Sequence, residues 1–342
     1  FSAASRILLV PSTKLRFSRI LFAAVLVPRA HRFLLAGLVA FLLASGSGCA
    51  RSHDSPGAET VVDDLERRVV LARPVERVVT LAPNLTEIVF AAGAGHKLVG
   101  VTTADDYPPA VDSLPRFGAL PIDFEAVTAL QPDLALATDQ VNSPRDAATF
   151  ASLDIPVYFF SFETLDDVLA SIRTTGRLLG TAADADAAAD SLQRTLDRLR
   201  AQTRDVERRP RVLFLIGDDT LYAFGAPSHI HALIEAAGGQ SVTADIAAAA
   251  PTLSEEYVLR RRPDVIIGAF GADYDPGRLL ALHPSWDVVP AVKNNRVYSL
   301  DPDLVLRPGP RLVEGAYRMA RMLHPSRVDS LAAALPRSTV RP

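Results

Sequence analysis

The feature that most constrains the fold of this chain is a segment that occurs twice. Residues 125–136 read Glu-Ala-Val-Thr-Ala-Leu-Gln-Pro-Asp-Leu-Ala-Leu, and residues 256–267 read Glu-Tyr-Val-Leu-Arg-Arg-Arg-Pro-Asp-Val-Ile-Ile. In each copy an acidic residue begins a two-turn helix, Pro-Asp ends it, and an apolar strand follows. Upstream, Arg77-Val-Val-Thr-Leu and Arg211-Val-Leu-Phe-Leu repeat at a similar spacing. The repeat predicts two lobes related by a pseudo-twofold axis, in which Glu125 and Glu256 occupy equivalent places.

From about Val61 onward, short β-branched runs alternate with segments of helical periodicity, which is typical of α/β architecture. We therefore expect two Rossmann-like α/β lobes. The first helix of the first lobe is expected to begin with Asn84 as its N-cap and to end at Gly93. The strands expected are 77–81, 99–101, 134–137, 157–160, 212–216 and 265–268, and the helices are 84–93, 124–130, 227–237 and 255–261.

Residues 165–207 separate the lobes and carry no strand signal. Glycines 176 and 180 are expected to divide this segment into two helices, and the second, near 184–206, would be about 35 Å long. Because a helix is stiffer than a Gly/Ser linker, the segment predicts a long rigid interdomain helix with a ligand cleft between the lobes. The apolar residues that recur in it at helical spacing are Ala185, Ala188, Leu192, Leu196 and Leu199.

The first 49 residues differ in charge from the rest of the chain. They carry six basic side chains and no acidic one, so the nominal net charge of −3 conceals 30 basic against 39 acidic residues in the remainder. The basic stretch leads into the apolar run 33–45, which as a helix of about 20 Å is too short for a hydrocarbon core of about 30 Å. We interpret residues 1–48 as an export signal, which predicts a periplasmic or cell-envelope location.

Cys49 is the single cysteine of the chain, so an internal disulfide and a thiolate zinc cluster are excluded. It follows the apolar run, where a bacterial lipoprotein carries its lipid-modified residue, and polar residues follow it. We expect lipidation at Cys49 and a membrane anchor; the alternative is a free cysteine in a small core. The predicted organisation is a signal (1–48), a tether (49–67), an N-terminal lobe (68–162), a connector (163–208), a C-terminal lobe (209–327) and a tail (328–342).

Four segments carry a resemblance to a known family. They are the motif from Arg77 to Glu87, the motif from Gly100 to Pro109, the repeated Glu-x6-Pro-Asp, and Arg307-Pro-Gly-Pro-Arg311. Over residues 68–325 the chain resembles the periplasmic substrate-binding proteins of bacterial importers for cobalamin, haem and iron siderophores, the class with a helical interdomain connector. The Asp-Tyr-Pro-Pro and Asp-Phe-Glu-Ala-Val segments are most similar to the cobalamin-binding members.

This resemblance implies a substrate-binding component of an ABC importer that captures cobalamin or a related corrinoid. A corrinoid is flat-faced and rimmed with amides, so aromatic faces and polar donors are the expected lining. The ligand-binding residues that the resemblance implies are Tyr107, Phe117, Tyr222, Asp303 and Arg307. Each aromatic has an alternative as an ordinary core residue, and Arg307 has one as a salt bridge that anchors its own Pro-rich loop.

The resemblance also implies that Glu125 and Glu256 dock onto arginines of a two-subunit membrane permease, one glutamate from each lobe. The alternative is that each is an acid favoured by the helix dipole, worth about 0.3–1 kcal/mol. Glu255 is adjacent and is an alternative to Glu256 as the projecting residue. We expect a monomer with no cofactor, no metal and no nucleic-acid partner.

An enzyme is the main alternative from another class, and the chain has no Gly-x-Gly-x-x-Gly after a strand, no Walker lysine loop and no Gly-x-Ser-x-Gly elbow. We therefore expect no enzymatic activity. Among ligands, haem is the second candidate, because Tyr107, Tyr222 and His229 could supply an axial ligand. A ferric siderophore would require a basic cleft, and a bare metal ion would require a cluster of histidines and carboxylates that the sequence does not show.

Overall fold

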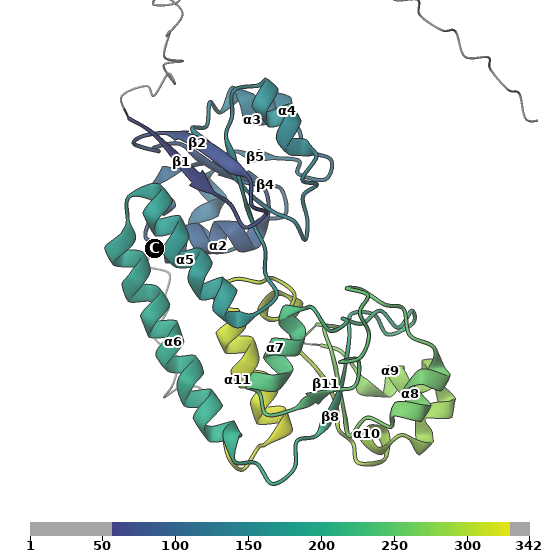
Figure 1. The fold of residues 1–342 in the computed structure, drawn as a ribbon. Coiled ribbons are helices and arrows are strands. Elements are labelled where there is room, and N and C mark those ends of the chain that lie inside the picture. Colours follow the sequence, from purple (N-terminus) through teal and green to yellow (C-terminus); the bar gives the residue numbers. More distant parts are fainter. Residues whose placement is uncertain (1–56, 272, 329–342) are drawn as a thin grey trace, which may run out of the picture. The chain divides into compact units, whose positions relative to one another are not determined.

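The computed structural model describes residues 57–271 and 273–328, and all of them belong to one compact unit that begins at Ser55. The predicted export signal, Cys49 and the tail beyond Val328 lie outside the described residues. Figure 1 shows two groups of strands joined by a pair of long helices. Every pairing within the five-stranded and the four-stranded sheet is parallel.

The N-terminal lobe is built on the five-stranded sheet, in the order β5-β4-β3-β6-β7. Its strands are β3 (Val78–Thr80), β4 (Leu98–Thr102), β5 (Arg116–Phe117), β6 (Leu134–Thr138) and β7 (Val157–Phe160). Its helices are α2 (Pro83–Ala91), α3 (Phe124–Ala129) and α4 (Asp146–Ser152), with 3-10 turns at Gly95–Lys97 and Pro109–Ser113. The C-terminal lobe has four strands in the order β11-β10-β8-β9.

The strands of the C-terminal lobe are β8 (Arg211–Leu215), β9 (Gln240–Ser241), β10 (Val265–Gly268) and β11 (Val297–Ser299). Its helices are α7 (His229–Ala236), α8 (Glu255–Arg261), α9 (Pro276–Leu282), α10 (Pro290–Lys293) and α11 (Leu312–Leu323), with 3-10 turns at Pro284–Val288 and Pro302–Leu304. The order β9-β8-β10-β11 matches β4-β3-β6-β7 of the first lobe, so the sequence repeat corresponds to a repeated topology.

The repeat also has the same hydrogen-bonded geometry in both lobes. The backbone N–H of Arg77 donates to the Asp133 carboxylate at 2.9 Å, and that of Arg211 donates to Asp264 at 2.9 Å. Each aspartate N–H in turn donates to the arginine carbonyl at 2.8 Å. Gln131 and Arg262, one residue before each Pro, adopt left-handed φ values of 48° and 47°. We call each set the aspartate corner of its lobe.

The connector consists of α5 (Leu165–Leu179) and α6 (Ala182–Arg204), which pack against each other (Figure 1). Gly180 ends α5 with a left-handed φ of 75°, as predicted. Gly176 does not divide the helices; it lies within α5, where a Cβ would stand 2.3 Å from the Cβ of Ala185 on α6. The absence of a side chain at Gly176 therefore lets the two helices approach closely.

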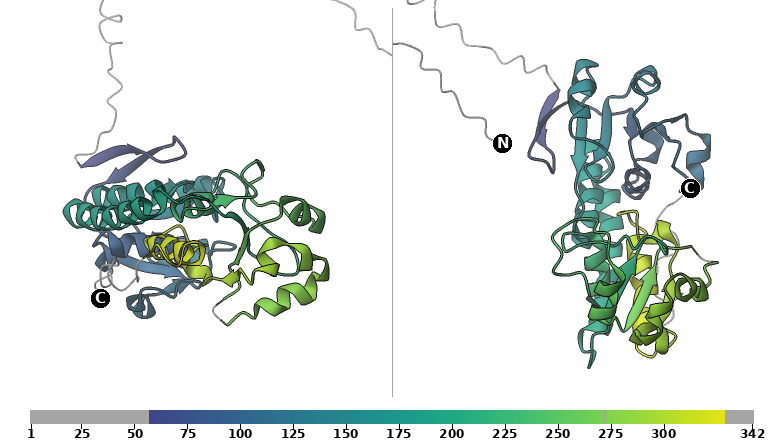
Figure 2. Two further views of the ribbon diagram at one scale, coloured as in Figure 1. Left: turned by 90° about the horizontal axis from the view of Figure 1, so that it is seen from below. Right: turned by 90° about the vertical axis from the view of Figure 1, so that its right-hand side faces the viewer.

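The connector is part of the hydrophobic core. Alternate residues of β3 point to opposite faces of the sheet, so that Val78 belongs to one core cluster and Val79 to another. The cluster of Val78 continues through Ile172 of α5 and Leu196 of α6 to Leu233 of α7. The two described lobes therefore share one core through the connector, and Figure 2 shows α6 beside α11 in both views.

Three local predictions need correction. Asn84 is not an N-cap: Pro83 occupies the first turn, where proline is favoured, and the helix begins after Ala82. The helix predicted from 227 begins at His229, with the Ser228 hydroxyl as its cap. Part of the predicted tether is a strand, since β1 (Ala58–Val62) pairs antiparallel with β2 (Arg68–Ala72).

Candidate functional site

In parallel sheets of this kind, ligands bind outside the carboxyl ends of the strands. Four of the five predicted ligand-binding residues lie on loops that leave those ends. Tyr107 follows β4, Tyr222 follows β8, and Asp303 and Arg307 follow β11. The topology therefore places these loops at the carboxyl ends of the two sheets, where a ligand would bind.

The fifth, Phe117, occupies a different environment. It is 2% exposed and packs in the core cluster of Val79 and Leu81, beneath Gly100, which has no side chain to displace it. A ring covered in this way offers no face to a ligand, so the structure contradicts the prediction for Phe117 and supports its alternative as a core residue. Tyr222, in contrast, is 48% exposed.

Arginines from the C-terminal lobe contact the N-terminal lobe at this edge. Arg311, which precedes α11, donates from Nε and Nη2 to the two carboxylate oxygens of Glu87 on α2, at 2.9 and 2.7 Å. Glu87 is 1% exposed, and burial raises the pKa of its carboxyl although Arg311 opposes the shift. The amide of Asn84 donates to the Pro308 carbonyl at 3.2 Å. Neither Glu87 nor Arg311 was predicted as a site residue.

Arg307 joins residues from both lobes. It pairs with Asp303 at 3.1 Å within its own lobe, and its Nη2 donates to Asp106 of the other lobe at 3.1 Å. Although burial opposes it, the bonds to these carboxylates raise the pKa of Arg307. Arg307 also lowers the pKa of Asp106. The alternative of a salt bridge within the Pro-rich loop describes only part of this arrangement, because the loop is tied to the other lobe as well.

Tyr107 lies next to this charged group. The Arg311 guanidinium stands over its ring at 4.4 Å from the centroid, a distance typical of a cation–π contact. Tyr107 is half-buried, so part of the side chain stays accessible. The structure thus brings Tyr107, Asp303 and Arg307 together, whereas Tyr222 lies beside Thr252 of its own lobe, which it pairs with in an isolated antiparallel bridge.

The loop after β10 contributes aromatic residues that sequence reasoning missed. Phe270 and Tyr274 pack with ring centroids 4.3 Å apart, and burial raises the pKa of Tyr274 to about 12. Arg278 pairs with Asp218 on the loop after β8, at 2.5 Å. Phe270 could have been predicted from its position, because it lies two residues beyond the strand Val265–Gly268 and therefore at the carboxyl end of that strand.

The predicted docking residues are equivalent in structure. Glu125 is the second residue of α3 and Glu256 the second of α8; each helix is capped by the side chain two residues before the glutamate, Asp123 or Ser254. Both glutamates are exposed. Glu255 is instead engaged, since it accepts from Ser285 at 2.7 Å and pairs with the buried His283 at 3.0 Å. Glu256 is therefore the freer of the two adjacent carboxylates.

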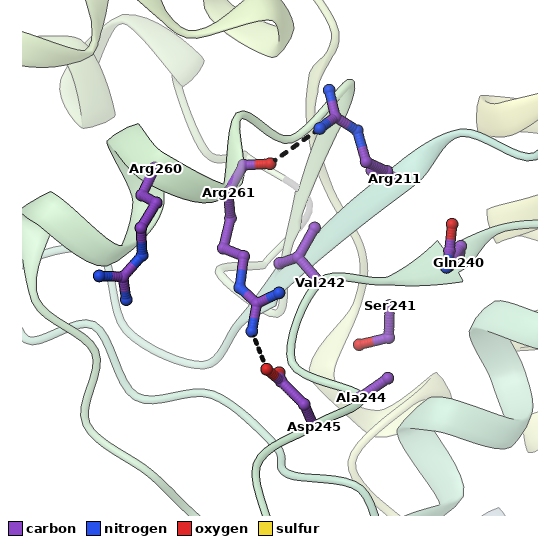
Figure 3. Close-up of a pocket in the computed structure, with 8 residues that line it drawn as sticks. All are labelled: Arg211, Gln240, Ser241, Val242, Ala244, Asp245, Arg260 and Arg261. Carbon is purple, nitrogen blue, oxygen red and sulfur yellow. Dashed lines mark hydrogen bonds and ion pairs between the residues drawn. The ribbon is translucent and has the colours of Figure 1, made fainter.

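The C-terminal lobe has a pocket of about 430 Å³ at the other end of its sheet, beside its aspartate corner. Figure 3 shows Arg261 pointing toward Asp245 and Arg211 toward the Arg261 carbonyl, while Arg260 points away. A second pocket, of about 500 Å³, lies between α5, α6 and α7. Neither pocket includes a predicted ligand-binding residue.

His229 and His231, two residues apart in the sequence, have separate partners. His229 is 3% exposed and its Nε2 contacts the Val305 carbonyl at 3.0 Å; burial lowers its pKa to about 4. His231 contacts the Ser241 hydroxyl at 2.9 Å. Across the described ranges, no three His, Cys, Asp or Glu side chains are grouped to hold a metal ion.

Comparison with known proteins identifies the family to which this architecture belongs. The family model described as "Periplasmic binding protein" matches residues 78–304, which include both sheets and the connector. The chain belongs to this periplasmic binding protein family.

The similar proteins in this family are named for different ligands. A vitamin B12-binding protein of Vibrio parahaemolyticus is 31% identical over 240 residues, which cover 70% of this chain and 86% of that protein. An uncharacterised ABC transporter substrate-binding lipoprotein of Bacillus subtilis, YvrC, is 27% identical and covers 84% of this chain and 95% of its own length. The periplasmic haem-binding protein of Roseiflexus sp. RS-1, in its apo form, is 26% identical with a TM-score of 0.64, over 73% of this chain and 98% of its own.

The periplasmic binding protein family is one of binding proteins and not of enzymes, in agreement with the motifs. Within the part of the chain that the structure describes, no helix has both the length and the apolar character that a membrane crossing requires.

Proposed function

We propose that this protein is the substrate-binding component of an ABC importer, and that it captures cobalamin or a related corrinoid between its lobes. The observation that carries the proposal is the meeting of Tyr107, Asp303 and Arg307 at the carboxyl ends of two sheets. An aromatic face beside a carboxylate and a guanidinium suits a flat ligand rimmed with amides. The similarity to a vitamin B12-binding protein over most of the chain supports the same ligand class.

Haem is the second candidate, and the similarity to a haem-binding protein favours it. Of the three residues considered for axial ligation, His229 is buried against the Val305 carbonyl, and Tyr107 is half-buried with one ring face against Arg311. Tyr222, 48% exposed, is the accessible one. A haem ligand would therefore depend on Tyr222, whereas a corrinoid would depend on Tyr107 and Asp303.

Calorimetry on the chain from Ser55 onward, with cyanocobalamin, haemin and a ferric siderophore, tests the ligand. We expect micromolar or tighter binding of cyanocobalamin, weakened at least tenfold in Tyr107→Leu and Asp303→Ala. Leu153→Ala, which changes a 37% exposed apolar residue before β7 and therefore at the opposite end of the sheet, is the matched control. No binding of cyanocobalamin, together with haemin binding that Tyr222→Phe abolishes, would establish the haem assignment instead.

Docking is tested by charge reversal. Glu125→Lys combined with Glu256→Lys should abolish uptake in cells while ligand affinity stays unchanged, because both carboxylates are exposed on equivalent helices. The control reverses two other exposed carboxylates, Glu66 and Glu163. Retained uptake in the Glu125/Glu256 variant would disprove docking, and a loss of ligand affinity would assign these residues to the ligand site or the fold.

Membrane attachment is proposed through lipidation of Cys49, supported by the name of the similar lipoprotein YvrC. Cys49→Ser should release the protein from the membrane fraction, and mass spectrometry of the wild-type amino-terminal peptide should show the added lipid. An unmodified Cys49 peptide would overturn this part of the proposal.

A further inference from the structure

A buried ion pair connects the two lobes. Glu87 lies in the middle of α2 and Arg311 directly precedes α11, so both side chains start from rigid elements. Two parallel bonds, at 2.9 and 2.7 Å, join the guanidinium to the carboxylate, and the Glu87 side chain is 1% exposed. A bidentate pair of this kind fixes orientation as well as distance.

The same guanidinium carries a second contact. Its Cζ stands 4.4 Å from the centroid of the Tyr107 ring, on the N-terminal lobe. Arg307, four residues earlier in the chain, bonds to Asp106, the neighbour of Tyr107. Two arginines of one lobe therefore hold two consecutive residues of the other.

The base of that loop is anchored within its own lobe. The Asp105 carboxylate, buried, accepts from the backbone N–H and the hydroxyl of Thr102 at 2.8 and 2.6 Å. With Asp105 fixed to β4, the part of the loop left to be placed is Asp106 and Tyr107. Arg116 of the same lobe donates to the Asp105 carbonyl, and the side chains of Asp106 and Tyr107 contact the C-terminal lobe.

Stability alone is a weak explanation for a buried Glu–Arg pair, because desolvation of two charges offsets most of their attraction. What such a pair supplies is a defined geometry. Here that geometry determines where the Tyr107 ring lies relative to Asp303 and Arg307.

We propose that Arg311, anchored by Glu87, is a positioning residue of the ligand site: together with Arg307 it clamps the loop of Asp106 and Tyr107 to the C-terminal lobe. Tyr107 is thereby held in place before a ligand arrives. The inference rests on the proposed function in one respect, the assignment of Tyr107 to the ligand site.

Hydrogen exchange on the ligand-free chain from Ser55 onward tests the clamp itself. Arg311→Lys keeps the charge opposite Glu87 but lacks the planar fork, and Glu87→Gln keeps the shape but loses the charge. In both we expect the amides of Asp106 and Tyr107 to exchange at least tenfold faster than in wild type, whereas those of residues 103–105, bonded within their own lobe, should change less. The matched control is Asp63→Asn, which removes a buried carboxylate paired with Arg67 inside one lobe. If Glu87→Gln fails to fold, Arg311→Lys decides; exchange at Asp106 and Tyr107 equal to that of the control overturns the clamp.

A double-mutant cycle tests positioning. Cyanocobalamin affinity is measured by calorimetry in Arg311→Met, in Tyr107→Leu and in the double variant. If Arg311 acts through Tyr107, Arg311→Met weakens binding about tenfold and the double variant binds no more weakly than Tyr107→Leu alone. Wild-type affinity in Arg311→Met, or fully additive losses, overturns positioning. Absence of binding in the wild type would refute the corrinoid assignment, and the exchange experiment would still decide whether the clamp exists.

Discussion

Asp133 of the N-terminal lobe and Asp264 of the C-terminal lobe form the same backbone hydrogen bonds at equivalent positions. Each accepts the backbone N–H of the arginine that precedes or begins a strand, and each follows a left-handed residue and a proline. The strand pairs beside them also correspond, since Val78 pairs with Leu134 and Val212 with Val265. The repeat therefore preserves the residues that determine backbone geometry.

The side chains around the two aspartate corners differ. At the position equivalent to Leu130, which covers Gly100 in the N-terminal lobe, the C-terminal lobe has Arg261, which reaches Asp245 and lines a pocket. Ala129 likewise corresponds to Arg260. One corner is thus closed by apolar packing and the other is open and charged, which shows that the repeat constrains the fold and leaves the surface free to diverge.

The lobes also differ in the direction in which folding shifts the pKa of several carboxyl groups. In the N-terminal lobe, burial raises the pKa of Asp64, Glu87 and Asp105. In the C-terminal lobe, a bond from Arg261 lowers the pKa of Asp245, and bonds from Arg211 lower that of Asp264 although burial opposes them. Carboxylates with a raised pKa favour the folded state in acid, whereas those with a lowered pKa disfavour it. Acid should therefore weaken these contacts of the C-terminal lobe, and with them the contact between Asp106 and Arg307 that joins the lobes.

The largest predicted effect of pH on the free energy of unfolding comes from His229 in the C-terminal lobe. Its pKa is about 4 in the folded protein against 6.5 for an unperturbed histidine, because burial disfavours the charged ring, although the bond to the Val305 carbonyl opposes the shift. Between these values the unfolded state binds more protons, so the free energy of unfolding falls as the pH drops from about 6.5 to about 4. The loss should be about 3 kcal/mol, measured by urea unfolding at a series of pH values.

His229→Phe provides the control for that measurement, since phenylalanine fills the site without titrating. The difference between wild type and variant should shrink as the pH falls through this window. A wild-type and a variant curve that stay parallel would show that His229 does not make the C-terminal lobe sensitive to acid.

A smaller effect tests whether the two aspartate corners are equivalent. Asp133→Ala and Asp264→Ala each leave the N–H of Arg77 or Arg211 without its carboxylate, which costs about 1–3 kcal/mol. We expect similar losses in the free energy of unfolding by urea. Asp287→Ala, at an exposed position without a left-handed φ, is the control. A loss confined to one of the two corners would mean that the repeat is preserved for a different reason in each lobe.

Local features of the fold could be predicted from the sequence because they depend on residues close together in the chain. Pro263 and Asp264 end α8 and begin β10, and Gly180 ends α5. The prediction was wrong where two local signals compete, as at Asn84, whose capping preference is overridden by Pro83. Strands of two residues, such as β5 and β9, carry no periodicity and were missed.

The candidate site was less predictable, since its contacts join distant parts of the chain. Glu87 and Arg311 are 224 residues apart, and nothing near either residue marks it as half of a buried pair. Phe117 shows the opposite error: the family pattern suggested a ligand contact, whereas the absence of a side chain at Gly100 makes room for the ring in the core. Only the packing of β4 on β5 decides between these alternatives.

The smallest predicted effect addresses the difference between the two corners directly. Arg261→Leu introduces into the C-terminal lobe the residue type found at Leu130, and it removes an ion pair whose side chains are 34% and 61% exposed. Because such pairs contribute about 0–1 kcal/mol, the free energy of unfolding should change by less than about 1 kcal/mol. Leu130→Arg should cost more, about 1–3 kcal/mol, since Leu130 packs against the core beside Gly100. Urea unfolding of both variants measures the contrast. Equal losses would mean that Arg261 supports its lobe as Leu130 does, and that the open corner is as much a part of the core as the closed one.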